Sequence, residues 1–530
     1  HDYYLMERKD NETISDIAAD LIYGNDGSSW ALNNSGEILT LSYASTTIDQ
    51  TVLCGAGPVW WCPGFNYKYR TMERNDPDLS GADSVSWGYN NGLIKNGKDM
   101  ASQPIYGTPK ARNSVNYLIS NGTSHISSDI TLTKAKSPYI VNNSNQYFQD
   151  NATLTIEPGA VIKFYNSAGL YFTGNSKIIA KGTAEEPIVF TSFEDDAYGG
   201  DLDNASTTPY AGGWLSVNID TTNNDSVFDN TVFRYGGKYY SMGDYSRANL
   251  GIKNSSVSVS NSVFEYSLAY GLKLTNSNSS VSNNIFRNNN YVGDTAGINS
   301  AIYISGGSPQ IKNNTVSQNG RGIYSVGSSA VIDSNVINSN VGEAIVSNAS
   351  GTITNNSGSG NGTDGIVFGL SNLSATLKPN SLPYILNYNV SVASSTTLTI
   401  EPGVTVTGSG KFGGGRLDVY GNLLIQGIIA SDVTFTSFWA SSSPLKHIGW
   451  YGIRMYSGSS SNIKGATIGY AENGIVYENS PVNLENVKFE NNNIAVKADS
   501  SSISGGAVST STIEFLNNTT NTIPSGLLGL

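Results

Sequence analysis

Five acidic residues lie within ten positions directly after Phe193. They occur in the string Glu194-Asp195-Asp196-Ala-Tyr-Gly-Gly-Asp201-Leu-Asp203. Hard cations such as Ca²⁺ take several oxygen ligands, and carboxylates spaced by glycines suit that need. The string predicts a calcium site whose ligands are Asp195, Asp196, Asp201 and Asp203. The alternative interpretation is an acidic loop that is simply solvated.

A second set of charged residues recurs along the chain. Arg234, Glu265 and Arg287 each follow a Phe, and Tyr235 and Tyr266 come next after the first two. If successive units stack as strands, these side chains point outward about 4.8 Å apart. One interpretation is a groove for an acidic glycan, in which Arg binds carboxylates and Tyr packs on sugar rings. The other is a ladder of alternating charge that stabilises the stack.

The sequence assigns no catalytic residue. Hydrolases and lyases that act on polysaccharides need clustered carboxylates, yet acids between 225 and 370 are few, and no pair is placed by its spacing to converge on one face. His125 and His447 are the internal histidines, so no Ser/His/Asp set is supported. Turnover is therefore disfavoured, although loops could bring a carboxylate pair together.

The two cysteines, Cys54 and Cys62, flank the string Gly-Ala-Gly-Pro-Val-Trp-Trp. In an exported protein such a pair most simply closes a small disulfide loop. A zinc site is disfavoured because the chain has 3 His and none of them lies near the cysteines in sequence.

Composition predicts that short β-strands position these residues. Ser, Asn and the 57 Gly favour turns, whereas Val, Ile, Thr and Tyr favour strands. Only 14% of residues are charged, which excludes a coiled coil. The net charge of −12 argues against nucleic-acid binding. No run of 18 apolar residues occurs, so we expect no membrane-spanning helix.

The chain holds a long-range duplication. Residues 153–164 (TLTIEPGAVIKF) resemble residues 397–407 (TLTIEPGVTVT), and three further landmarks recur in the same order. These are Ser137-Pro138-Tyr139-Ile140-Val141 with Leu382-Pro383-Tyr384-Ile385-Leu386, Val189-Phe190-Thr191-Ser192-Phe193 with Thr434-Phe435-Thr436-Ser437-Phe438, and Gly213-Trp214 with Gly449-Trp450. The order predicts two copies of one module, 120–370 and 371–530, in which the two Trp are packing anchors.

A shorter period lies inside the modules. Asn-containing units end at positions 233, 264, 286, 316, 337 and 358, so the step is either 21–22 or 30–31 residues. This spacing indicates a stacked β-solenoid with loop insertions. We expect the Asn side chains to stack as an amide ladder at a turn, namely Asn230, Asn261, Asn283, Asn313 and Asn355. The alternative is that Asn merely tolerates left-handed turn geometry there.

Gly-Ile or Gly-Leu follows several of these units, at Gly271, Gly322, Gly365 and Gly474. With this pattern, the sequence over roughly 120–530 resembles right-handed parallel β-helix proteins. The resemblance implies an all-β fold, and it says little about activity because this fold has many functions. The acidic string also resembles an insertion of related bacterial β-helix proteins, where calcium is the expected ion. Its counterpart in the second module, Trp439-Ala-Ser-Ser-Ser-Pro, has no acids.

Residues 1–115 lack the coil period. The string Asn34-Ser-Gly-Glu37-Ile-Leu39-Thr-Leu41, with Glu73-Arg74, Trp87 and Gly107-Thr108-Pro109, resembles a lamin-tail domain, an immunoglobulin-like β-sandwich. The opening strands of that family are missing. One interpretation is a truncated product. The other is that a second chain supplies the missing strand.

The sequence therefore predicts an all-β protein, an immunoglobulin-like β-sandwich followed by two right-handed parallel β-helix modules. We expect an exported structural protein of the bacterial cell surface that self-assembles or adheres. Partners would be further copies, through strand complementation or end-to-end stacking, and glycans. The alternatives are a carbohydrate-active enzyme, either a polysaccharide lyase or a glycoside hydrolase, and a glycan-binding protein without turnover.

Overall fold

The computed structural model describes most of the chain. The described residues are 3–24, 38–51, 69–74, 80–82, 86–90, 92, 94–114, 125–141, 145–202, 207–239, 247–289, 299–348, 351–368, 374–409, 415–438, 440, 450–499 and 508–524. The chain divides into two compact units, 1–249 and 250–530. Strand β19 (Ala248–Lys253) runs across that division. Within the described part, no helix is long and apolar enough to cross a membrane.

The first 115 residues contribute three two-stranded sheets in their described part. They are β1 (Met6–Arg8) with β2 (Leu21–Tyr23), β3 (Thr40–Tyr43) with β4 (Thr46–Gln50), and β5 (Met72–Arg74) with β6 (Trp87–Tyr89). The first pair is parallel and the other two are antiparallel. The lamin-tail-like sandwich stays a prediction, and so do the predicted domain boundaries.

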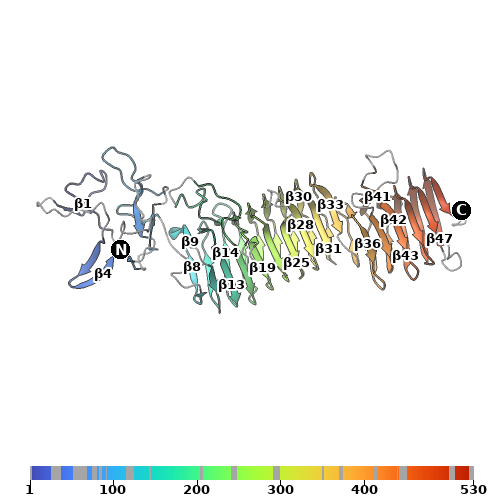
Figure 1. Ribbon diagram of the computed structural model, residues 1–530, viewed down its shortest axis with the longest axis horizontal. Coiled ribbons are helices and arrows are strands. Elements are labelled where there is room, and N and C mark those ends of the chain that lie inside the picture. Colours follow the sequence, from blue (N-terminus) through green and yellow to red (C-terminus); the bar gives the residue numbers. More distant parts are fainter. Residues whose placement is uncertain are drawn as a thin grey trace. The chain divides into compact units, whose positions relative to one another are not determined.

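The rest of the first unit is a stack of coils, each made of three short strands (Figure 1). The first sheet contains β7 (His125–Ile126), β10 (Gln146–Phe148), β13 (Leu170–Gly174) and β16 (Val217–Thr221). The second contains β8 (Ile130–Leu132), β11 (Thr153–Ile156), β14 (Lys177–Lys181) and β17 (Val227–Asp229). The third contains β9 (Tyr139–Val141), β12 (Val161–Phe164), β15 (Ile188–Ser192) and β18 (Thr231–Arg234). All pairings are parallel, as a solenoid requires.

The second unit begins with coils of the same kind. One sheet holds β20 (Ser258–Ser260), β23 (Ser280–Ser282), β26 (Gln310–Lys312), β29 (Val331–Asp333) and β32 (Thr352–Thr354). The next holds β21 (Val263–Glu265), β24 (Ile285–Arg287), β27 (Thr315–Ser317) and β30 (Val336–Asn338). The last holds β22 (Tyr270–Thr275), β25 (Ser300–Ser305), β28 (Arg321–Val326), β31 (Glu343–Asn348) and β33 (Thr363–Phe368).

A second group of coils follows in the same unit. Its first sheet begins with β34 (Ala375–Leu377), β37 (Thr397–Ile400) and β40 (Asn422–Gln426). Its second sheet begins with β35 (Tyr384–Leu386), β38 (Thr405–Gly408) and β41 (Val433–Ser437). Both continue into the long strands β43 (Ser460–Gly469), β45 (Val482–Glu490) and β47 (Val508–Leu516). The third sheet contains β36 (Asn389–Val392), β39 (Gly415–Val419), β42 (Trp450–Met455), β44 (Asn473–Tyr477), β46 (Ile494–Ala498) and β48 (Thr520–Ile523).

Inward side chains stack on their equivalents one coil away and form the core. Phe148 and Phe172 lie 4.7 Å apart between ring centroids, and Phe264 and Phe286 lie 4.8 Å apart. All four side chains are fully buried. Each buried Phe contributes roughly 1.5–3 kcal/mol of transfer free energy. The predicted coil period is therefore explained by columns of apolar residues.

The duplicated motifs occupy equivalent strands. Residues 153–156 form β11 and residues 397–400 form β37, so the repeated string lies in the same place of each module. Trp214 and Trp450 are both buried, as packing anchors should be. Their indole N–H groups donate to equivalent carbonyl groups, Trp214 to Arg234 O at 2.8 Å and Trp450 to Gly469 O at 3.0 Å.

The predicted Asn ladder is wrong by one residue. The positions that we expected to stack adopt left-handed backbone conformations, for example Asn283 with φ 58° and Asn313 with φ 56°. The turn interpretation of these residues is therefore confirmed. An amide ladder does exist, but it consists of the next residue of each doublet.

Two ladders of buried Asn run along the second unit. In the first, each Nδ2 donates to the Oδ1 of the Asn one coil on, at 2.9 to 3.0 Å, through Asn284, Asn314, Asn335, Asn356 and Asn380. The second contains Asn289, Asn319, Asn340 and Asn361. Each ladder ends on a different acceptor, the Tyr384 hydroxyl at 3.0 Å for the first and Asp364 Oδ1 at 2.8 Å for the second.

Candidate functional site

The acidic loop packs on the outer face of the third sheet of the first unit. Asp195 is buried, and its Oδ2 accepts a 2.6 Å hydrogen bond from Thr191 Oγ1 on β15. Arg234 Nη1 lies 3.5 Å from the same oxygen. The Arg234 guanidinium also lies over the rings of Tyr198 and Tyr235, at 5.1 and 4.8 Å. The carboxylate of Asp195, one of the predicted calcium ligands, is therefore already bound by Thr191 and Arg234.

The other predicted calcium ligands do not join Asp195. Asp201 Oδ2 pairs with Arg70 Nη2 at 2.8 Å, and Asp196 is exposed. Asp203 lies outside the described residues. Among the residues that the structure describes, no group of three or more His, Cys, Asp or Glu could hold a metal ion. The described donor set does not fit calcium, and the calcium assignment stays a prediction.

One step of the predicted charge ladder, from Glu265 to Arg287, is present in the second unit. Glu265 and Arg287 are register partners on β21 and β24, and Arg287 Nε lies 2.7 Å from Glu265 Oε2. The Glu265 side chain is buried, whereas that of Arg287 is about half exposed. Pairing of opposite charges between neighbouring coils is therefore confirmed for these two residues.

The tyrosines of the predicted glycan groove occupy turns. Tyr235 and Tyr266 have φ of 65° and 53°, so each marks a left-handed turn directly after its strand. Arg234 Nη2 donates to the Tyr235 hydroxyl at 3.0 Å. Arg234 and Tyr235 belong to the first unit and the other three residues to the second. Glycan binding by this set stays a prediction.

Acids of the coil region between 225 and 370 bind neighbouring protein groups. Glu343 Oε2 lies 2.6 Å from Arg321 Nε, and Asp333 Oδ1 accepts from Asn355 Nδ2 at 3.0 Å. Asp364 receives the last amide of the second ladder and the backbone N–H groups of Gly360 and Asn361. These carboxylates hold coils and turns together.

A further cluster of charged and aromatic residues lies on the third sheet of the second coil group. We call it the Arg–Tyr patch, and it comprises Arg416, Asp418, Tyr420, Arg454, Tyr456, Glu478 and Asp499. Arg416 binds Asp418 through two bonds of 2.7 and 3.1 Å. Arg454 binds both Glu478 and, at 2.9 Å, Asp499. Tyr420 and Tyr456 stack with ring centroids 4.2 Å apart.

The electrostatics of this patch favour its charged pairs. The hydrogen bond to Asp418 raises the pKa of Arg416 above its usual range. Burial alone would lower the pKa of Arg454, but the bond to Glu478 and the nearby carboxylates outweigh it and raise that pKa. Burial, the hydrogen bond to Tyr420 and the charge of Asp418 raise the pKa of Tyr456 to about 12. Tyr456 is therefore a neutral hydroxyl donor at physiological pH.

Sequence reasoning missed the Arg–Tyr patch. The available signal was the alternation Arg416-Leu-Asp418-Val-Tyr420, which runs along β39 to the residue after it, together with Arg454-Met-Tyr456 at the end of β42. Asp418 and Arg454 are register partners on these strands. The step between them is 36 residues, which is longer than the coil period of the first module.

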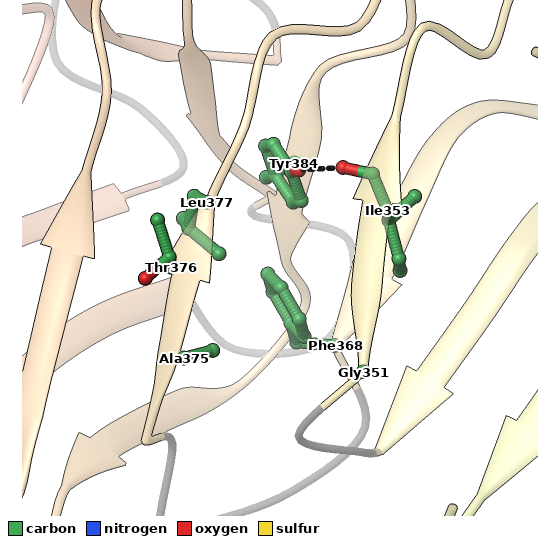
Figure 2. Close-up of a pocket in the computed structure, with 7 residues that line it drawn as sticks. All are labelled: Gly351, Ile353, Phe368, Ala375, Thr376, Leu377 and Tyr384. Atoms are coloured by element: carbon green, nitrogen blue, oxygen red, sulfur yellow. Dashed lines mark hydrogen bonds between the residues drawn. The ribbon is translucent and has the colours of Figure 1, made fainter. Parts of the chain in front are cut away.

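A small apolar pocket lies in the second unit where one sheet of the first coil group ends. Figure 2 shows Phe368 and Tyr384 facing it from one side and Ala375 and Leu377 from another. The pocket is small and partly open to solvent, and the figure of about 210 Å³ for the empty space beside its walls includes that open solvent. The Tyr384 hydroxyl donates to the Ile353 carbonyl at 2.9 Å. The described lining is mainly apolar, so the pocket is a gap in the packing of these side chains.

Cys54 and Cys62 lie outside the described residues, so the disulfide stays a prediction.

Two known families match the coil region. The family described as right handed beta helix region matches residues 215–382, and the pectate-lyase like beta helix domain matches residues 124–238. Over residues 124–382 the chain therefore resembles right-handed parallel β-helix proteins, and the parallel sheets of the structure are consistent with that fold.

The likeness of this chain to whole proteins is weak. No curated protein matches this sequence. Among solved structures, a mutant tailspike protein of E. coli bacteriophage HK620 is similar, at 12% identity over 71% of this chain and 73% of that chain. The TM-score of 0.21 is low, so this likeness supports no statement about function.

Proposed function

We propose that this chain is an exported structural protein of the bacterial cell surface, a β-helix scaffold that self-assembles or adheres. The observation that carries this proposal is the use of its polar side chains as bonds between coils. Two Asn ladders run through the second unit, and Glu265 with Arg287 and Glu343 with Arg321 link neighbouring strands. Such side chains are committed to holding the stack in register.

The rival function is turnover of a polysaccharide. The purified full chain is incubated with a panel of anionic and neutral polysaccharides, with a known lyase and a known hydrolase as positive controls. We expect neither unsaturated product, read by absorbance, nor new reducing ends. Release of oligosaccharide from any member of the panel would contradict the structural proposal and support a carbohydrate-active enzyme.

Glycan binding without turnover is a second candidate function, and the Arg–Tyr patch favours it. Tyrosine combines an apolar ring, which can pack on the face of a sugar, with a polar hydroxyl. Tyr420 is 42% exposed, so it is available to a ligand. Both Arg of the patch are already paired with carboxylates, so the patch suits a neutral oligosaccharide and not an acidic one.

A glycan array tests this candidate. The full chain is expected to retain neutral glycans, and Tyr420→Ala should weaken that binding at least tenfold. Tyr388→Ala is the matched control, because Tyr388 is 54% exposed and lies outside the patch. Equal binding by all three proteins, or no binding by any, would count against the candidate.

A further inference from the structure

Two cations lie on the outer face of the third sheet of the first unit, beneath the acidic loop. Lys163 on β12 is fully buried, and it is the register partner of Thr191 on β15. Its Nζ donates to the Gly200 carbonyl in the loop. The side chain of Arg234, at the end of β18, is 13% exposed and faces Asp195. The loop therefore covers both cations.

Buried cations require compensation. A buried ammonium or guanidinium group loses its hydration, and this cost is large unless an opposite charge or hydrogen-bond acceptors replace the water. Asp195 supplies a carboxylate to Arg234, and Gly200 supplies a carbonyl to Lys163. The loop thus provides acceptors for the sheet that it covers.

The same loop binds a cation from the first 115 residues. Arg70 Nη2 pairs with Asp201 Oδ2 at 2.8 Å, and Arg70 Nη1 also donates to the Asp201 carbonyl. The two side chains are 6% and 13% exposed. The segment around Arg70 precedes β5, so this contact connects that segment with the β-helix.

The second module offers an internal comparison. The register of β12 with β15 and of β38 with β41 makes Thr407 the counterpart of Lys163. The equivalent indole hydrogen bonds make Gly469 the counterpart of Arg234. The six residues after Phe438, Trp439-Ala-Ser-Ser-Ser-Pro, contain no acid. The cations and the acidic loop thus occur together in one module and are both missing from the other.

We infer that residues 194–202 form an electrostatic clasp, in which Asp195 and Asp201 neutralise Arg234 and Arg70, and that the loop is not a calcium site. Asp195 and Asp201 are already paired with Arg234 and Arg70, on separate sides of the loop. A divalent cation would have to displace both guanidinium groups and leave them buried without an opposite charge, which is costly. The clasp holds the Arg70 segment on the outer face of the β-helix.

Thermal unfolding of the full chain separates the clasp from a calcium site. We expect Asp195→Asn and Asp201→Asn to lower the Tm by several degrees, while EDTA and excess calcium chloride leave the wild-type Tm unchanged. Asp225→Asn is the matched control, because Asp225 lies outside the loop and its side chain is 73% exposed. A Tm that falls with EDTA, or an equal loss in Asp225→Asn, would overturn the clasp.

A double-mutant cycle tests the link to Arg70. Hydrogen exchange of amides in β5 and β6 is compared for wild type, Arg70→Met, Asp201→Asn and the double variant. We expect exchange to accelerate severalfold in each single variant and no further in the double, because both remove one interaction. Independent, multiplicative effects, or unchanged exchange in both single variants, would show that the pair does not hold this segment.

Discussion

At the scale of residues, asparagine serves two purposes in this protein. In the doublets Asn283-Asn284, Asn313-Asn314 and Asn355-Asn356 the first residue takes a left-handed turn, and the second turns its amide into the stack. Asn335, which follows the left-handed Ser334, takes the second role. It is fully buried, its Nδ2 donates to Asn356 Oδ1 and Ile311 O, and its Oδ1 accepts from Asn314. Each amide thus bonds both neighbouring coils.

Asn335→Ala should therefore destabilise the protein strongly. The substitution leaves the Asn314 amide and the Ile311 carbonyl without their partner, and each unsatisfied buried group costs about 1–3 kcal/mol. We expect a loss of roughly 3 kcal/mol or more, measured by urea unfolding.

The control is Asn313→Gly, at an exposed position with φ 56°. Glycine adopts this conformation without strain, so a loss below about 1 kcal/mol is expected. Equal losses in both variants would contradict the division of roles within the doublets.

Tyr456 makes a prediction about alkaline pH. Its pKa is raised to about 12 in the folded chain, from 10.0 for an unperturbed tyrosine. The neutral phenol is thus favoured by folding, and its contribution is complete below pH 10 and is lost as pH rises toward 12. The urea midpoint of the wild type should fall more steeply between these pH values than that of Tyr456→Phe. Parallel curves would show that burial of Tyr456 does not shift its titration.

At this scale the sequence shows residue types but not their orientation. An Asn-Asn doublet such as Asn283-Asn284 does not reveal which amide faces the stack, since both residues favour turns. The acids of the loop can be read directly from the sequence. Lys163 and Arg234 cannot be recognised there as neighbours of Asp195, because they lie 32 residues before it and 39 residues after it. Folding brings these charges together, and this changes the interpretation of the loop.

At the scale of elements, the two coil groups of the second unit join with a change of sheet. Strand β33 pairs with β35, so one sheet of the first group continues as a different sheet of the second. Strand β36 then starts a new sheet with β39. The apolar pocket lies at this junction, between β32 and β34. The repeat pattern predicted both groups, but it carries no information on how one continues into the other.

Filling the pocket should stabilise the junction. Ala375→Val adds two carbon atoms to the side chain and places them in the gap beside Phe368. Burying this apolar surface should raise the free energy of unfolding by about 1 kcal/mol. Thr376→Val is the control, because Thr376 is the next residue of β34 and is exposed. Urea unfolding should show a gain in the first variant and little change in the second. A destabilised Ala375→Val would mean that the gap is too small for the added carbon atoms.

At the scale of the whole molecule, the stacked coils explain why the sequence has few charged residues and many turn-forming residues. Ser, Asn and Gly form the turns, and Val, Ile and Phe fill the columns, so a polar chain still buries a continuous core. The net charge of −12 includes the acidic loop, which the second module lacks. The sequence predicted this architecture because its period is regular, whereas residues 1–115 have no such period and their sandwich awaits a test.

The central claim, a structural role at the bacterial cell surface, is tested most directly by electron cryotomography of native cells labelled with a gold-conjugated antibody fragment against the second unit. The account predicts label outside the cell envelope, in continuous arrays or fibres, and its loss in a strain that lacks the gene. Label confined to the cytosol, or protein released into the medium as separate monomers, would contradict the claim.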